Sequence, residues 1–202
     1  MTDVKLDGVA VYISKIEDNT VIEKLFSEER SREIEETRNA RAGLEKYSVF
    51  KLLEKAVSEE LGISPNEAKI YKNENRRWTS RLFDFSLSHS KCAVAVALSE
   101  KPIGIDLEVL CGKDRTGLAK KYFSPLEYAE YEALRGEEKE IYFLTKWTAK
   151  EALFKSKNEA QFIPSKVNPK SDEVLTQLVV IDGEKYVLSV APKCKGIKIR
   201  II

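Results

Sequence analysis

The chain has 202 residues, and its content of 33% charged and 43% hydrophobic residues is typical of soluble globular proteins. The formal net charge of +1 gives no global field that would attract nucleic acid or an anionic membrane, so we expect neither partner and only local anion sites. The sequence shows no basic leader with an apolar core and no apolar run of about 20 residues, so we expect a cytoplasmic protein without a signal peptide or membrane span.

The first half of the sequence predicts a strand, two helical stretches and further strands. Gly8–Ile16 is short and β-branched, as in a strand, and the composition from residue 19 to about residue 41 is charged and helical. Apolar residues from Val49 to Leu61 recur at helical spacing, with Gly62 as the expected C-cap. The elements expected next are a short strand at 68–73, a polar connector at 73–84, an apolar strand at 93–98, and a turn at 99–102 that joins it in a hairpin to an acidic strand at 103–109.

The second half repeats this order loosely, with helices before strands. Ser124 and Pro125 predict a cap and a first-turn proline for one helix, and residues 137–157 predict a longer one. Three strands follow, at 175–182, 185–192 and 196–202. We therefore predict an α+β fold of two pseudo-symmetric halves, each with helices on a small, mostly antiparallel sheet, covering residues 1–102 and 103–202.

The acidic strand carries Asp106 and Glu108 on one face, while its apolar residues take the other face. Two like charges side by side repel each other. A hard divalent cation would offset the repulsion, because Mg²⁺ and Ca²⁺ prefer oxygen ligands. The alternative is an amphipathic strand whose acidic face is wet, and this fragment alone favours the wet face.

The predicted helix "TKWTAKEALFK" places Lys146, Lys150 and Glu151 near one face, with Lys155 one turn after Glu151. The structural alternative is a solvated helix with a few tenths of a kcal/mol of ion pairing. The functional alternative is that Glu151 is a third oxygen ligand and that the lysines bind an anion beside it.

His89 is the only histidine, and it lies between Ser88 and Ser90 just before the apolar strand. A lone histidine is more often structural than catalytic, yet three donors at the mouth of a strand can bind a phosphate. P-loop, G-x-G-x-x-G and G-x-S-x-G motifs are absent, which argues against nucleotide-binding folds and Ser–His–Asp hydrolases. Three cysteines without a CxxC pair exclude a cysteine zinc site.

Four segments, in this order, resemble the motif series of the Sfp-type 4′-phosphopantetheinyl transferases: "FSLSHS" (85–90), "IGIDLE" (103–108), "FSPLE" (123–127) and "WTAKEALFK" (147–155). That family carries SHS, G-[IV]-D-x-E and W-[ST]-x-K-E-[AS]-x-x-K motifs. The resemblance implies the family's α+β fold. It also implies transfer of the phosphopantetheine arm of coenzyme A to a serine hydroxyl of an apo carrier protein, with release of adenosine 3′,5′-bisphosphate.

The resemblance further implies roles for single residues. The metal ligands for Mg²⁺, or Mn²⁺ in its place, would be Asp106, Glu108 and Glu151. Contacts to the nucleotide phosphates would come from Ser88, His89, Lys150 and Lys155. For the 3′-phosphate the match is softer, and the candidates are Lys46, Arg41, Arg76 and Arg77. The catalytic set would be Lys155 with a general base, either Glu151 or Glu127, although Glu127 can also simply favour its helix dipole.

The partners implied are coenzyme A and an apo acyl or peptidyl carrier protein, and the length matches the monomeric two-half type. The docking candidate is residues 111–131, which combine cations with apolar anchors: Lys113, Arg115, Lys120, Lys121, Leu118, Tyr122 and Phe123. The alternative is that the anchors are core residues. Two other functions stay open: a metal-dependent hydrolase of nucleotide pyrophosphates, and a non-enzymatic module that binds carrier proteins or coenzyme A.

Overall fold

The computed structural model describes residues 6–202; residues 1–5, part of the segment expected to hold no leader, lie outside the described residues. The helices are α1 (Glu28–Glu35), α2 (Ala40–Leu61), α3 (Thr116–Tyr122), α4 (Pro125–Ala133), α5 (Gly136–Lys157) and the 3₁₀ turn η1 (Pro164–Lys166). The strands are β1 (Val9–Lys15), β2 (Ile70–Lys72), β3 (Trp78–Ser80), β4 (Asp84–Ser90), β5 (Ala93–Ser99), β6 (Gly104–Val109), β7 (Leu175–Ile181), β8 (Glu184–Ala191) and β9 (Ile197–Ile201). Within residues 6–202, no helix has both the length and the apolar character needed to cross a membrane.

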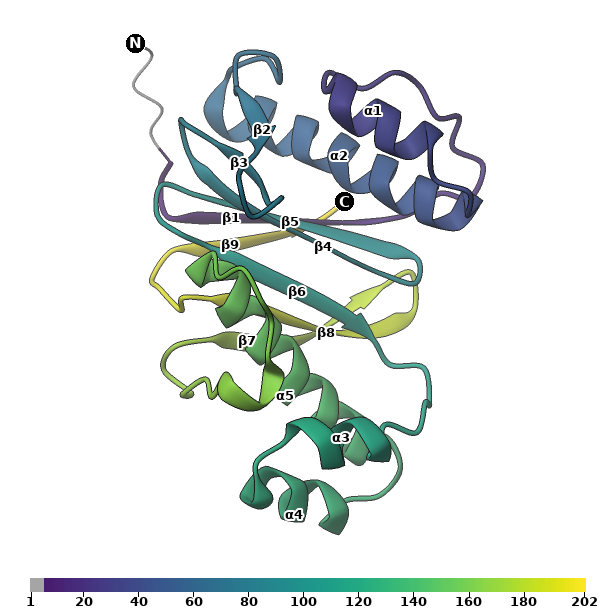
Figure 1. Cartoon of the computed structure of the whole chain (residues 1–202), viewed down its shortest axis with the longest axis vertical. Helices are drawn as coiled ribbons and strands as arrows, with labels where there is room; N and C mark the ends of the chain where they lie inside the picture. The colour runs from purple at the N-terminus through teal and green to yellow at the C-terminus, as the bar shows by residue number, and fades with distance from the viewer. Residues whose placement is uncertain (1–5) are drawn as a thin grey trace.

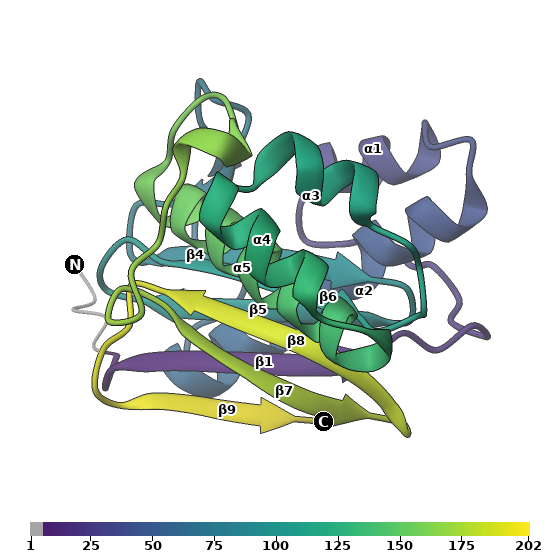
Figure 2. The same ribbon diagram turned by 90° about the horizontal axis from the view of Figure 1, so that it is seen from below.

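Helices and sheets stack in layers along the long axis of the molecule (Figure 1). Helices α1 and α2 cover a first sheet of order β4-β5-β1-β9, which packs on a second sheet of order β6-β8-β7. Helix α5 covers the outer face of the second sheet, and α3 and α4 lie outside α5 (Figure 2). A separate ribbon of β2 and β3 completes the α+β fold, which confirms the predicted fold class.

Strand periodicity divides the core between these layers. In β1, Val9, Val11 and Ile13 pack toward the second sheet, whereas Ala10 and Tyr12 pack toward α2. Strand β5 (AVAVALS) is buried along its whole length and alternates in the same way, with its alanines toward the second sheet. The first sheet is therefore apolar on both faces, one for α2 and one for the second sheet.

Capping residues set the ends of the first two helices. The Ser27 hydroxyl accepts a hydrogen bond from the Arg30 backbone N–H, and the Asn39 side chain accepts one from the Ala42 N–H. The helical stretch expected over residues 19–41 is therefore only partly right. Helix α1 begins after Ser27, and the chain breaks before Asn39 starts α2.

Other helix signals in the sequence are confirmed. Gly62 ends α2 in the left-handed conformation, at φ 61°, which a glycine adopts without strain. Ser124 and Glu127 form a reciprocal capping box at the start of α4, and Pro125 lies in the first turn of this helix.

Three predictions about strands are wrong. Strands β5 and β6 do not form a hairpin, because β5 pairs with β4 and β1 while β6 pairs with β8. The apolar faces of β5 and β6 instead meet across the interface between the sheets. The connector expected at 73–84 contains β3, which pairs with β2. The SHS triplet precedes β5 as expected, but it lies inside strand β4 and not at the mouth of a strand.

The last strand joins the first sheet. Strand β9 runs parallel to β1, with Ile197 opposite Val9. Residues 103–202 thus contribute a strand to the sheet of residues 1–102, and a division of the chain at residue 102 stays a prediction.

Helix α5 lies directly on strand β6 at Gly104. A Cβ atom at this position would lie 1.9 Å from the Ala152 carbonyl oxygen and 2.6 Å from the Ser156 backbone nitrogen. The glycine that precedes Asp106 is therefore required for close approach of the helix. The contact brings the last turns of α5 over the acidic strand.

We expect Gly104→Ala to lower the free energy of unfolding by about 3 kcal/mol, because an added methyl group forces α5 away from β6. Urea unfolding measures the change. The matched control is Gly117→Ala in α3, where an added Cβ meets nothing within 4 Å, and it should keep wild-type stability or exceed it slightly. Equal unfolding midpoints for both variants would contradict the contact at Gly104.

Candidate active site

Strand β4 lies beside β6 where the edges of the two large sheets meet. The Oγ atoms of Ser86, Ser88 and Ser90 accept hydrogen bonds from the backbone N–H groups of Ile105, Leu107 and Val109, each at 3.1 Å. His89 lies on the opposite face of β4, because neighbouring residues of a strand alternate. The three donors that the sequence placed around one phosphate therefore do not converge in this structure.

Asp106, Glu108 and Glu151 form an acidic group, and Asp106 is its buried member. Its Oδ1 atom accepts hydrogen bonds from the Ser88 hydroxyl at 2.9 Å and from Lys155 Nζ at 2.7 Å. Its Oδ2 atom is buried and has no hydrogen-bond partner among residues 6–202. A buried carboxylate oxygen without a partner is energetically costly, so this atom is available to a further donor or cation.

Glu108 and Glu151 extend the acidic group from β6 and α5. Burial raises the pKa of Glu108, and the negative charge of Asp106 raises it further, although the Ser90 hydroxyl donates to its Oε2 at 2.9 Å. Burial also raises the pKa of Glu151 to about 7, together with the negative charges of Asp106 and Glu108. The three carboxylates thus share one electrostatic environment.

Lys155 is the cation of this group. Its Nζ atom lies 3.4 Å from Glu151 Oε2, in addition to its bond to Asp106, and it donates to the Ile105 carbonyl at 3.1 Å. Burial lowers the pKa of Lys155, but the charges of Asp106 and Glu151 outweigh burial and raise it overall. Lys155 is therefore a fully charged partner held between two of the acids.

The acidic group fits a divalent cation chemically. Within residues 6–202, no three His, Cys, Asp or Glu side chains lie close enough to enclose a metal ion as they stand, and the Lys155 ammonium occupies the space between Asp106 and Glu151. The unpartnered Asp106 oxygen and the mutual repulsion of the carboxylates are both features that a cation would relieve. An all-oxygen donor set suits Mg²⁺.

A cationic cavity of about 330 Å³ adjoins the acidic group on the side of α1 and α2. Its lining combines five cations and His89 with apolar side chains and contains no acidic residue: Arg30, Lys46, Val49, Arg76, Arg77, Trp78, Phe85, Ser86, Leu87, His89 and Lys155. Acidic side chains pair with some of the lining residues: Glu33 Oε2 lies 3.1 Å from Arg30 Nη1, and Glu45 Oε2 lies 3.4 Å from His89 Nδ1. Partial burial lowers the pKa of His89, and the negative charge of Glu45 opposes the shift. We interpret the cavity as an anion site.

Arg30 is a cavity residue that the sequence interpretation missed. Its side chain is 9% exposed, and its guanidinium lies 4.2 Å from the Phe50 ring centroid and 5.0 Å from that of Trp78. Its Nε atom is buried without a hydrogen-bond partner, and burial lowers its pKa to about 10. The Nη1 atom of Arg30 already donates to Glu33 Oε2 at 3.1 Å, so the Nε N–H is the donor that is suited to a further anionic oxygen.

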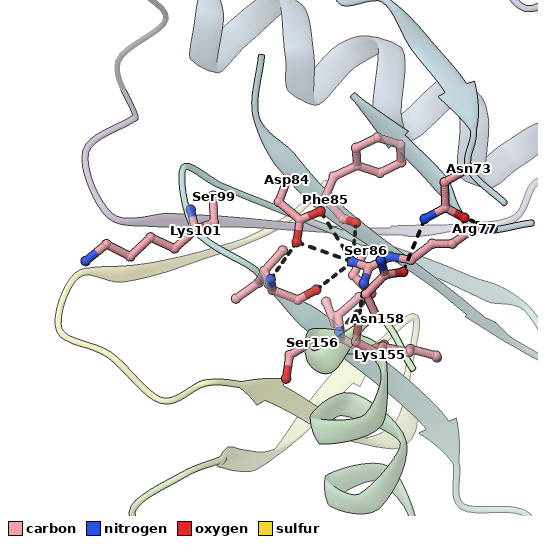
Figure 3. Close-up of polar contacts among 12 residues, drawn as sticks. Asn73, Arg77, Asp84, Phe85, Ser86, Ser99, Lys101, Lys155, Ser156 and Asn158 are labelled. Carbon is pink, nitrogen blue, oxygen red and sulfur yellow. Dashed lines mark hydrogen bonds and ion pairs between the residues drawn. The ribbon is translucent and has the colours of Figure 1, made fainter. Parts of the chain in front are cut away.

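Arg77 ties the elements around the site together (Figure 3). Its guanidinium donates to the backbone carbonyls of Phe85 at 3.1 Å, Ile103 at 3.0 Å and Lys155, and it pairs with Asp84 at 3.3 Å. It therefore clamps β4, the start of β6 and the end of α5, and it offers less of its charge to a ligand than the sequence implied. Arg76, beside it, lines the cavity.

Three predicted residues lie apart from the acidic group and the cavity. The Lys150 side chain is 0% exposed, and its Nζ atom donates to the Val167 carbonyl at 2.7 Å and pairs with Glu127 at 3.4 Å. Burial lowers the pKa of Lys150. Glu127 serves the capping box of α4, and Arg41 pairs with Asp18 at 2.6 Å outside the cavity lining.

Comparison with known proteins finds relatives for part of the chain. A family model described as the 4′-phosphopantetheinyl transferase superfamily matches residues 102–182. A 4′-phosphopantetheinyl transferase of Bacillus subtilis is 36% identical over 81 residues, 40% of this chain and 35% of the relative. The transferase HetI of Nostoc sp. is 36% identical over 104 residues (48% and 44%), and Sfp of Bacillus subtilis strain 168 is 34% identical over 80 residues (40% and 35%).

These matches span less than half the length of each of the three relatives. The matched segment nevertheless contains Asp106, Glu108, Glu151 and Lys155, the residues that form the acidic group. Residues 102–182 are therefore similar to the 4′-phosphopantetheinyl transferase superfamily, and the fold around them is α+β.

Proposed function

We propose that this protein is an Sfp-type 4′-phosphopantetheinyl transferase that modifies a serine of an apo carrier protein in a Mg²⁺-dependent reaction. One observation carries the proposal: Lys155 belongs both to the acidic group and to the lining of the cationic cavity. A ligand with several phosphates, such as coenzyme A, can therefore occupy the cavity with its pyrophosphate next to the acids. The matched superfamily segment supports the same assignment.

The reaction is a displacement at phosphorus. The serine oxygen of the carrier forms a bond to the phosphorus that bears the pantetheine arm, and the pyrophosphate P–O bond breaks. Adenosine 3′,5′-bisphosphate leaves with the electron pair of that bond, and the serine proton passes to a base. Because negative charge grows on the leaving phosphate, nearby cations stabilise the transition state.

The residues of the acidic group take distinct parts in this proposal. Asp106, Glu108 and Glu151 would hold Mg²⁺, which supplies charge neutralisation at the pyrophosphate when bound. Lys155 would contact the same phosphates. Glu151 is the better placed of the two candidate bases, because the Glu127 carboxylate already caps α4 and pairs with Lys150.

The cationic cavity would bind the nucleotide end of coenzyme A. Lys46, a residue of α2, donates from Nζ to Thr37 Oγ1 over 2.9 Å. It lines the same cavity as His89 and Arg30. These side chains replace Arg41 and Arg77 as the leading candidates for the 3′-phosphate, because Arg41 lies outside the lining and Arg77 is occupied by backbone carbonyls.

The carrier protein would dock on α3 and the start of α4. Lys120, Lys121 and Leu118 are exposed there, and Leu126 of α4 is 70% exposed. Of the other two predicted anchors, Phe123 is buried and Tyr122 is only partly exposed. Phe123 is buried in the cluster around Phe143, and Tyr122 packs on Trp147 with ring centroids 5.8 Å apart.

Arg115 differs from the exposed lysines of the docking segment. Its guanidinium lies 5.3 Å from the Phe143 ring centroid, and its Nε atom is buried without a hydrogen-bond partner. The surface proposed for docking is therefore the lysine pair with Leu118 and Leu126.

Metal dependence gives the first functional test. A chelator should abolish phosphopantetheine transfer, measured as the mass gain of an apo carrier on its serine, and Mg²⁺ should restore it. Asp106→Asn should lower kcat/KM about 100-fold or more while the protein stays folded, because the substitution keeps the shape and removes the charge. Glu159→Gln, at an exposed position, is the matched control and should keep wild-type activity.

The same assay separates the alternatives. Release of adenosine 3′,5′-bisphosphate from coenzyme A and Mg²⁺ without any carrier would identify a hydrolase. Wild-type carrier binding without any modification of apo carriers would identify a binding module. Transfer that survives in Asp106→Asn would rule out the metal assignment.

If the cavity binds the 3′-phosphate, the protein should distinguish coenzyme A from dephospho-coenzyme A, which lacks this phosphate. Dephospho-coenzyme A should bind the wild type more weakly than coenzyme A in calorimetric titration. Lys46→Ala and His89→Ala should each reduce the difference about tenfold, because each removes a donor to an anionic oxygen. Arg41→Ala should keep the wild-type difference in affinity between the two ligands. If only Arg41→Ala removed that difference, the 3′-phosphate would bind outside the cavity.

The docking surface predicts a charge effect on one substrate only. The double variant Lys120→Glu/Lys121→Glu should raise KM for the carrier about tenfold at low salt and less at high salt, since exposed charges are screened. KM for coenzyme A should hardly change. The control Lys51→Glu/Lys55→Glu makes the same change in net charge on α2, at the opposite end of the molecule (Figure 1), and should leave both KM values near wild type. If KM for the carrier and KM for coenzyme A both rose in the Lys120→Glu/Lys121→Glu variant, these lysines would instead bind the nucleotide.

A further inference from the structure

Strand β4 carries three serines at every second position, and all three point toward β6. Ser86, Ser88 and Ser90 are 4%, 5% and 8% exposed, so water does not compete for their hydroxyl groups. Each Oγ atom accepts one hydrogen bond at 3.1 Å from a backbone N–H of β6. We call these three residues the serine ladder, because they replace the backbone pairing that would otherwise join two neighbouring strands.

The three positions differ in where the hydroxyl proton goes. Ser88 donates to Asp106 Oδ1 and Ser90 donates to Glu108 Oε2, each at 2.9 Å. Ser86 makes the same bond to the β6 backbone, but it donates to no carboxylate in the part of the chain that the structure describes. The chain therefore contains an internal comparison between a serine that only joins the strands and two serines that also hold an acid.

We infer that Ser88 and Ser90 are positioning residues that hold the two acids of β6 in place for a divalent cation. The inference rests on the metal site of the proposed function and adds residues to it. Asp106 and Glu108 carry like charges on one face of a strand, and free carboxylates would rotate apart to lower their repulsion. A hydroxyl donor on one oxygen of each acid opposes this rotation and leaves the other oxygen available, as the unpartnered Asp106 Oδ2 illustrates.

The arrangement also separates the parts of the SHS motif. Ser88 and Ser90 serve the acidic group, and His89, on the opposite face of β4, serves the cationic cavity. One strand thus fixes the positions of both neighbouring sites.

The test compares Ser86→Ala, Ser88→Ala and Ser90→Ala in the full chain. The thermal midpoint without metal reports the loss of the backbone bond, which all three variants share, and of the bond to a carboxylate, which only Ser88→Ala and Ser90→Ala also lose, so we expect a decrease in every variant. The Mg²⁺ concentration dependence of the midpoint reports affinity for the metal alone. Ser88→Ala and Ser90→Ala should each weaken Mg²⁺ binding about tenfold, and Ser86→Ala less than twofold.

Two results would overturn the inference, and they are distinguishable. If Ser86→Ala weakens Mg²⁺ binding as much as the other two variants, the serines only join the strands. If Mg²⁺ leaves the wild-type midpoint unchanged at all concentrations, the metal site itself is wrong, and the proposed function fails together with the inference.

Discussion

Burying three carboxylates together is electrostatically unfavourable, and much of this structure compensates for it. Asp106 and Glu108 come from a strand, and Glu151 comes from a helix that must lie close to that strand. The missing side chain at Gly104 permits the close approach, and Lys155 and the serine hydroxyls then supply the donors. Each compensating group is tied to a different element, so the acidic group exists only when β4, β6 and α5 are all in place.

The cationic cavity is linked to this group by backbone as well as by charge. Lys155 presents its ammonium to the acids and its carbonyl to Arg77, which also holds β4 and the start of β6. Lys155, which belongs to both sites, is thus held at its side-chain ammonium by the acids and at its backbone carbonyl by Arg77. A ligand that spans the cavity and the acids would meet side chains whose separation is set by a rigid framework, which reduces the entropy lost on binding.

Local patterns in the sequence predicted much of the fold. Gly62 and the Ser124–Pro125 pair marked helix ends correctly because caps depend only on near neighbours. The β5–β6 hairpin failed because a short turn between two apolar strands does not reveal whether they pair or face each other across a sandwich. The place of β9 beside β1 has no local signal at all.

In the candidate site too, local motifs predicted some residues correctly, and long-range packing decided the others. Asp106, Glu151 and Lys155 were found through their motifs, and the structure brings them together. The opposite orientations of Ser88 and His89 would have followed from placing the triplet inside a strand. Lys150 lies within a motif and yet points into the interior, because its helix face is set by packing that no motif encodes. Arg30 belongs to no motif, and its only signal was the four-residue spacing from Ile34 on one face of α1.

The parallel pairing of β9 with β1 has a consequence for how the chain acquires its structure during synthesis. Strand β1 finds its partner β5 early, but its other edge is covered only by residues 197–201. Until those residues are made, a ribosome-bound chain presents an open edge of the strand Val9–Lys15, and closing the loop between the two strands is slow because of its length. The unfinished chain should therefore depend on chaperone protection of that edge, more than a protein whose halves complete their sheets in turn.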